Sequence, residues 1–128
     1  MINDLPDSVE YINAGWNYNG KIKKLPKSLK EFRIYGNCNK KIPFPEDLNI
    51  LYLPNNYKYK NIPKKLKVLR LGYNCHLKLE DLPDTLEELK IVDPIIKYDY
   101  DNVYKYFPNL KVFDRPIVVK QKILVKMN

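Results

Sequence analysis

The side chains that most often act as nucleophiles, bases or metal ligands are scarce in this chain. It contains one histidine, His76, and two cysteines, Cys38 and Cys75. The adjacent pair Cys75 and His76 is the one place that resembles part of a metal site. However, neighbouring residues of an extended chain point in opposite directions, and no further ligands cluster nearby. With four glycines, the chain also lacks a glycine-rich phosphate loop. The sequence therefore predicts no metal site and no cofactor.

Two acidic clusters have the composition of an acid–base pair. They are Glu87 with Glu88, and the segment from Asp99 to Asp101. Acid–base catalysis needs a carboxyl group whose pKa is raised inside a pocket. The surrounding patterns predict an exposed strand for the first cluster and a helix for the second, so both should be solvated charge. We therefore expect that the protein is not an enzyme.

The elements that would position any site are set by an internal repeat of 18 to 20 residues. In each unit an apolar–Pro pair precedes apolar residues in the frame L-x-x-L-x-L. Such alternation predicts a short strand with one buried face, and stacking the units in parallel joins those faces into one core. The apolar–Pro pairs are Leu5-Pro6, Leu25-Pro26, Phe44-Pro45, Ile62-Pro63 and Leu82-Pro83, and a column of asparagines follows the frame at Asn17, Asn37, Asn56 and Asn74.

This frame resembles the leucine-rich repeat, L-x-x-L-x-L-x-x-N-x-L. The Ile-x-x-Leu-Pro close of residues 22–26, followed by Ser28-Leu29, resembles more narrowly the short FNIP-type repeats of social amoebae and of giant viruses of amoebae. The fifth unit departs from the pattern, because Pro94 stands in place of its asparagine. The resemblance covers about residues 2–94. It implies a leucine-rich-repeat solenoid, α/β by family, that forms a curved right-handed coil of about five to six repeats.

The resemblance also implies a non-catalytic role in protein–protein interaction. Similar repeats are often joined to an F-box that recruits substrates for ubiquitin ligases, and we expect no such segment ahead of Met1. The chain is then expected to act as a free-standing recognition domain for a host or viral protein. If it is viral, the expected location is the host cytoplasm.

The connections and the C-terminal end follow from the repeat length. Units this short leave no room for a full helix on the convex side, where we expect extended or 3-10 segments, and the asparagines should satisfy backbone groups where the chain turns. A cap over about residues 95–128 should cover the end of the core, so residues 1–128 form a single domain. The cap includes a helix over residues 98–107 with Tyr100, Val103, Tyr104 and Phe107 on one face, followed by the apolar runs 116–119 and 123–125.

The strands of such a solenoid line its concave face, and their outward residues are the candidate binding surface. Aromatic and apolar residues beside arginine have the composition of protein-binding hot spots. The alternative is that these side chains only form local cross-strand pairs. Trp16, next to Asn17, is expected to pack over the first repeat. The candidate partner-binding residues are Tyr11, Arg33, Tyr35, Ile50, Tyr52, Val68, Arg70 and Lys90.

The net charge of +8 comes mostly from lysine. Lysines concentrate in the middle repeats and should lie on loops and on the convex side, where they would keep the protein in solution. Their alternative role is binding of nucleic acid or another polyanion. A further alternative is self-association through the thinly capped N-terminal edge, which gives a monomer or a weak homodimer. The lysines concerned are Lys21, Lys23, Lys24, Lys40, Lys41, Lys58, Lys60, Lys64 and Lys65.

The cysteine positions and the lengths of the apolar runs indicate the cellular compartment of the protein. Cys38 and Cys75 should lie two strands apart, about 9.6 Å, which exceeds the limit of roughly 7 Å between the Cα atoms of a disulfide. Buried, reduced thiols are therefore expected, as in an intracellular protein. The sequence shows neither a signal peptide nor an apolar run long enough to cross a bilayer. We expect a cytoplasmic protein that is not secreted and has no membrane partner.

Overall fold

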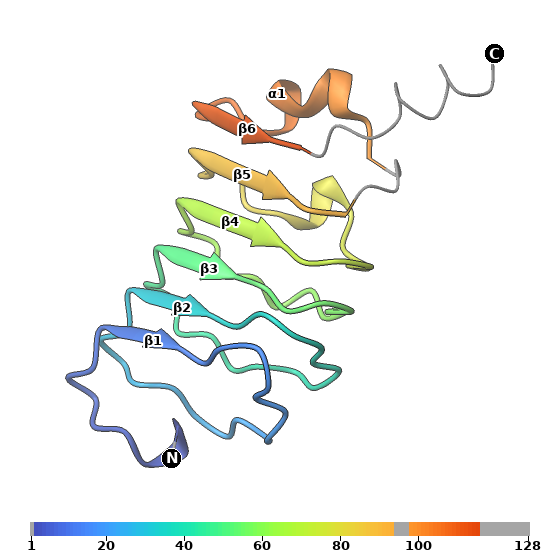
Figure 1. The fold of residues 1–128 in the computed structure, drawn as a ribbon. Coiled ribbons are helices and arrows are strands. Elements are labelled where there is room, and N and C mark those ends of the chain that lie inside the picture. Colours follow the sequence, from blue (N-terminus) through green and yellow to red (C-terminus); the bar gives the residue numbers. More distant parts are fainter. Residues whose placement is uncertain (1, 94–97, 116–128) are drawn as a thin grey trace, which may run out of the picture.

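The molecule is a solenoid of parallel strands in which each turn contributes one strand (Figure 1). The computed structural model describes residues 2–93 and 98–115. The predicted fold class, a repeat solenoid of short parallel strands, is confirmed. Within the described residues the sheet has six strands in chain order, namely β1 (Tyr11–Asn13), β2 (Glu31–Arg33), β3 (Ile50–Tyr52), β4 (Val68–Leu71), β5 (Glu88–Ile91) and β6 (Val112–Asp114).

The register between strands follows the sequence repeat. Arg33 of β2 lies beside Tyr52 of β3, and Tyr52 lies beside Arg70 of β4. Residues at equivalent positions of successive units therefore form columns that run across the sheet. These are the columns that the L-x-x-L-x-L frame predicts, so the frame fixes which side chains are neighbours on each face.

The core is a column of apolar side chains behind the sheet. The middle residue of each of the first five strands points inward and is at most 8% exposed, while its two neighbours point outward. Because every strand buries its middle residue against the turns on either side, the core is continuous along the solenoid. These residues are Ile12, Phe32, Leu51, Leu69 and Leu89.

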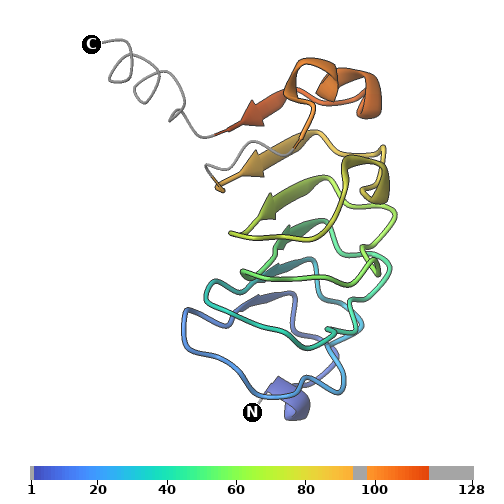
Figure 2. The same ribbon diagram turned by 90° about the vertical axis from the view of Figure 1, so that its right-hand side faces the viewer.

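Between successive strands from β1 to β5 the chain is extended or forms single 3-10 turns, as the repeat length predicts. The turns η1 (Ile2–Asp4) and η2 (Leu79–Asp81) are examples. Figure 2 shows the turns stacked above one another, with the N-terminus at one end and the C-terminal helix α1 (Val103–Tyr106) at the other. Since no long helix separates the turns, their side chains pack directly on one another.

The asparagine column forms a hydrogen-bonded ladder at three of its four predicted positions. Asn74 Nδ2 donates to Asn56 Oδ1 (2.8 Å), and Asn56 Nδ2 donates to Asn37 Oδ1 (3.3 Å). Asn17 is exposed and, in the described part of the chain, has no hydrogen bond to Asn37. The ladder therefore does not reach Asn17, although the offset of 20 residues between Asn17 and Asn37 matches the offset between the paired residues of β1 and β2.

The ladder residues turn the chain with their own backbone, and an acid extends the ladder at its end. Asn56 and Asn74 have positive φ angles of 66° and 53°, a region that asparagine tolerates better than most residues. Beyond them the buried carboxylate of Asp93 accepts a hydrogen bond from the backbone N–H of Asn74 (2.7 Å). Asp93 therefore takes the place that the sequence frame assigns to the residue after it, Pro94.

The C-terminal end is capped by a shorter helix than predicted. The 3-10 turn η3 (Tyr100–Asn102) leads into α1, which has four residues. Val103 and Phe107 are buried as expected, but Tyr104 is 57% exposed, so the predicted apolar face is wrong at this position. The reason is that the 3-10 turn rotates the chain relative to a continuous α-helix. The predicted apolar runs at 116–119 and 123–125 lie outside the described residues.

One polar network lies inside the core, around Tyr57. Its hydroxyl donates to Asn61 Oδ1 (2.7 Å) and accepts from the backbone N–H of Ile42 (3.3 Å). Asn61 Nδ2 in turn donates to the carbonyl of Ile42 (2.6 Å). The Tyr57 side chain is fully buried, and this burial raises the pKa of Tyr57 to about 12.

This network predicts a loss of stability in alkaline solution. A tyrosine whose folded pKa lies above its unfolded value of about 10 stabilises the fold fully below pH 10, and this contribution is lost as the pH rises through 12. For Tyr57 the loss is about 2–3 kcal/mol in the free energy of unfolding. Urea unfolding between about pH 9 and 12 should show it, and Tyr57→Phe should make this part of the profile less steep. A slope of the same sign should remain from Tyr98, whose pKa is also raised by burial. An unchanged profile in Tyr57→Phe would contradict the assignment.

Candidate functional site

The outward face of the sheet, here called the strand face, carries a group of aromatic and arginine side chains in mutual contact. The group is centred on β2, β3 and β4 and on the residues that follow β1 and β2. We call it the aromatic–arginine cluster. It consists of Trp16, Arg33, Tyr35, Tyr52 and Arg70.

The rings of the cluster come from three successive turns. Trp16 stacks on Tyr35 with ring centroids 5.0 Å apart and an interplanar angle of 22°. Tyr35 meets Tyr52 edge to face at 6.1 Å. Both arrangements are favourable geometries for aromatic pairs, so each ring restricts its neighbour and the surface is ordered before anything binds.

The two arginines lie over these rings. The guanidinium carbon of Arg33 is 4.3 Å from the centroid of the Tyr52 ring. That of Arg70 is 5.2 Å from the Tyr35 ring and 5.7 Å from the Tyr52 ring. These distances fall in the range of cation–π attraction, which is stronger for arginine than for lysine because the guanidinium is planar and more weakly hydrated.

The two arginines differ in their acidic neighbours. Arg33 Nε forms an ion pair of 2.7 Å with Glu31 on the same strand. Hydrogen bonding with Tyr35, and then with Glu31, raises the pKa of the Arg33 guanidinium above its usual range. For Arg70, no ion pair is found among the residues that the structure describes. Arg70 is therefore held by rings, but its charge has no acidic partner on this face.

The strand face also has a hollow over β3 to β6, which the cluster residues Tyr52 and Arg70 help to line. It has a volume of about 120 Å³. Lys90 at its wall forms an ion pair of 3.5 Å with Asp114, and Glu88 is exposed. Apolar contacts come from Val68 and Val112. The hollow thus extends the cluster with both apolar and charged groups.

The eight predicted binding residues fall into three groups. Arg33, Tyr35, Tyr52 and Arg70 belong to the cluster, while Val68 and Lys90 line the hollow that adjoins it. Ile50 is half-buried in β3. Tyr11 projects from β1 and is 54% exposed, and no ring contact joins it to the cluster within the described residues.

Sequence analysis missed Trp16 as a surface residue. The prediction that it packs over the first repeat is wrong, because Trp16 is 67% exposed. The sequence feature that could have indicated this exposure is a pair of glycines next to the two stacked residues, Trp16 and Tyr35. Gly15 has a φ of 74° and turns the chain just before Trp16, and a Cβ on Gly36 would lie 2.0 Å from the Trp16 carbonyl oxygen. The two turns therefore approach closely, and the indole rests on Tyr35 outside the core.

The side chains that looked able to do chemistry are held in structural roles. Cys38 and Cys75 are buried and are not joined in a disulfide, as predicted. Among the described residues, no group of three or more histidine, cysteine or acidic side chains is placed to hold a metal ion. Glu87 is paired with Lys111 (3.2 Å) and Lys67 (3.3 Å). Hydrogen bonds from these two lysines lower the pKa of Glu87, the opposite of what acid catalysis requires.

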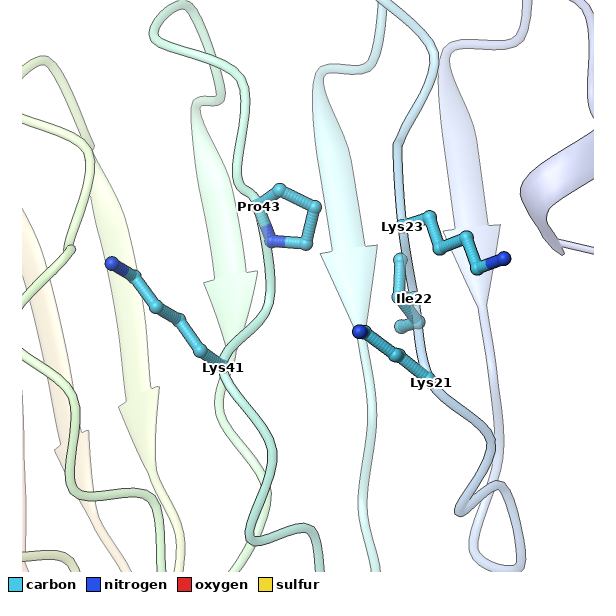
Figure 3. Close-up of a pocket in the computed structure, with 5 residues that line it drawn as sticks. All are labelled: Lys21, Ile22, Lys23, Lys41 and Pro43. Carbon is cyan, nitrogen blue, oxygen red and sulfur yellow. The ribbon is translucent and has the colours of Figure 1, made fainter.

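The predicted lysines of the middle repeats are all exposed. Some of them bind acids of neighbouring turns, as in the pairs Lys65–Asp47 (3.2 Å) and Lys60–Asp81 (3.7 Å). Others surround a shallow depression of about 310 Å³ on two neighbouring turns (Figure 3). It is lined by Lys21, Ile22, Lys23, Lys41 and Pro43.

Comparison of the chain with known protein families, with curated proteins and with solved structures finds no match. Within the described residues, no helix is long and apolar enough to cross a membrane.

Proposed function

We propose that this chain is a leucine-rich-repeat interaction module that binds another protein through its strand face. The observation that carries the proposal is the aromatic–arginine cluster. Tyrosine, tryptophan and arginine are the residues that dominate binding energy at protein interfaces. Here five of them are ordered by mutual contacts of 4.3 to 6.1 Å while Trp16 stays largely exposed, so little conformational freedom is lost on binding.

The charges of the strand face support a protein partner over a polyanion. The cations Arg33, Arg70 and Lys90 share the face with the acids Glu31, Glu88 and Asp114. A phosphate backbone would gain from the cations and be repelled by the acids. A protein segment that mixes apolar and charged side chains fits this face better.

The kind of partner follows from the resemblance of the repeats. Because they are similar to the FNIP-type repeats of social amoebae and giant viruses of amoebae, we propose a host or viral protein of an amoeba, met in the cytoplasm. The chain then acts by recognition alone, without catalysis. The paired state of Glu87 and the buried cysteines support this, since neither arrangement provides a reactive group.

Site-specific photo-crosslinking tests the proposal. Tyr11 on the strand face and Tyr104 on α1 are matched, being 54% and 57% exposed. Each is replaced in turn by p-benzoylphenylalanine, and the protein is irradiated in an amoebal lysate. We expect discrete crosslinked products from position 11 and none from position 104. Equal products from both positions would contradict binding through the strand face.

A second candidate function is binding of a polyanion by the lysine side. It is favoured by the depression in Figure 3, because Lys21, Lys23 and Lys41 have no ion pair within the described residues. Binding to duplex DNA should then fall steeply with salt concentration. Failure to bind at about 50 mM salt would exclude this candidate.

A further inference from the structure

We propose that Arg70 anchors a carboxylate of the partner, so that the strand face recognises an extended segment whose surface-facing residues include an apolar side chain and, about four positions away, an acidic one. This inference rests on the proposed function and names the chemistry of the partner. It starts from a difference between the cations of the strand face, because within the described residues some of them form an ion pair with an acidic residue and Arg70 does not.

Arg70 is the strand-face cation whose charge is left available. Arg33 is bound to Glu31 at 2.7 Å, and Lys90 is bound to Asp114 at 3.5 Å. Arg70 lies near two tyrosine rings, which contact its guanidinium but do not neutralise it. A planar guanidinium offers its N–H groups as a rigid fork, the geometry that binds a carboxylate through two hydrogen bonds.

The groups around Arg70 require apolar residues on either side of that carboxylate. Toward the N-terminal turns lie the rings of Tyr35 and Trp16. Val68 lies two residues before Arg70 on the same strand, and Val112 lies toward the C-terminal turns; both line the hollow. A carboxylate that reaches Arg70 therefore carries neighbours that contact rings on one side and aliphatic side chains on the other.

The length of the segment follows from the spacing of the turns. Trp16 and Arg70 belong to the first and fourth turns, and three steps between neighbouring strands span about 14 Å. An extended chain covers this distance with about four residues. Its side chains alternate between facing the surface and facing away, so an apolar residue on Trp16 and an acidic residue on Arg70 fit one continuous segment.

The nearby acids exclude a denser negative charge. Glu88 shares the hollow with Arg70, and Asp114 and Glu31 flank it on the same face. A segment with one or two separated carboxylates avoids these groups. A single-stranded nucleic acid, with a phosphate on every nucleotide, does not.

Trp16 makes the experiment direct, because it is the one tryptophan of the chain and lies in the cluster. The probe is a blocked hexapeptide with leucine at position 1, aspartate at position 5 and serine elsewhere, and the matched peptide has asparagine in place of aspartate. Binding is followed by Trp16 fluorescence. We expect the aspartate peptide to bind about tenfold or more tightly than the asparagine peptide, as a charge-assisted hydrogen bond provides.

Two variants assign the preference to Arg70. In Arg70→Gln the two peptides should bind equally, while Lys65→Gln, which removes an exposed cation paired with Asp47 outside the strands, should keep the preference. Arg70→Lys should retain part of it, because it keeps the charge but not the planar fork. Urea unfolding of each variant confirms that the fold is intact.

The possible failures are distinguishable from failure of the proposed function. Equal binding of both peptides by the unaltered protein, or no fluorescence change at about 1 mM aspartate peptide, overturns the role of Arg70, yet leaves crosslinking from position 11 as independent support for the strand face. Tighter binding of an oligouridylate that is lost in Arg70→Gln overturns both proposals in favour of nucleic acid.

Discussion

Phe32→Ala should lower the free energy of unfolding by about 3–5 kcal/mol. Phe32 is the inward residue of β2, is fully buried, and meets the Phe44 ring at 6.1 Å. Removing its ring loses the burial free energy of the side chain and leaves a cavity that the turns on either side close only in part. A domain of this size is stabilised by about 5–15 kcal/mol in total, so the variant should unfold at a clearly lower urea concentration.

Phe113→Ala is the matched control for this substitution. Phe113 occupies the same column in β6, but it is only partly buried and meets the Tyr100 ring at 5.7 Å. Because it is enclosed less completely, the same change should cost well under the loss at Phe32. If both substitutions lowered the free energy of unfolding equally, this would contradict the conclusion that the core is enclosed most tightly between the inner turns.

Gly36→Ala should be the most damaging change outside the core. A Cβ at Gly36 would lie 2.0 Å from the backbone oxygen of Trp16, and the φ of 21° lies at the edge of the left-handed region. Backbone, unlike a flexible side chain, cannot move aside cheaply, so the first two turns must separate. Strain and overpacking together predict a loss of about 2–5 kcal/mol.

Gly15→Ala separates these two causes. Gly15 also has a positive φ, 74°, but a Cβ there would meet nothing within 4 Å. Only conformational strain applies, about 1–2 kcal/mol. Gly36→Ala should also expose Trp16 further, because the indole leaves Tyr35 when the turns separate, and its fluorescence emission should shift to the red. Equal destabilisation by the two changes would show that the close approach of the turns is unimportant.

The fold was predictable because the same pattern of apolar residues occurs in every repeat. Each unit contains the same strand pattern, so the register can be predicted even where one unit is irregular. Counting residues within the repeat places Arg33, Tyr52 and Arg70 in one column. The spacing of the prolines also predicted the absence of long helices between strands. What the frame specifies is which residues of successive turns become neighbours.

The candidate site was predictable only in part, because the frame says nothing about residues beyond the strands. Trp16 lies outside the alternating positions, and its exposure depends on two glycines that bring neighbouring turns together. Asn17 keeps both the residue type and the register of the ladder, yet it forms no hydrogen bond to Asn37 within the described residues. The ion pairs that leave Arg70 without an acid depend on side-chain conformations, which periodicity does not determine.

The order of the strands has a consequence for how the molecule comes apart. Every strand pairs only with the strands before and after it in the chain, so removing β1 exposes β2 without disturbing β5. Pulling on one terminus should therefore peel the structure turn by turn, and thermal fraying should begin at the ends and reach β3 and β4 last. The same locality keeps partners in the sheet about 20 residues apart in the chain, which favours rapid growth of the sheet from any pair of turns that has formed.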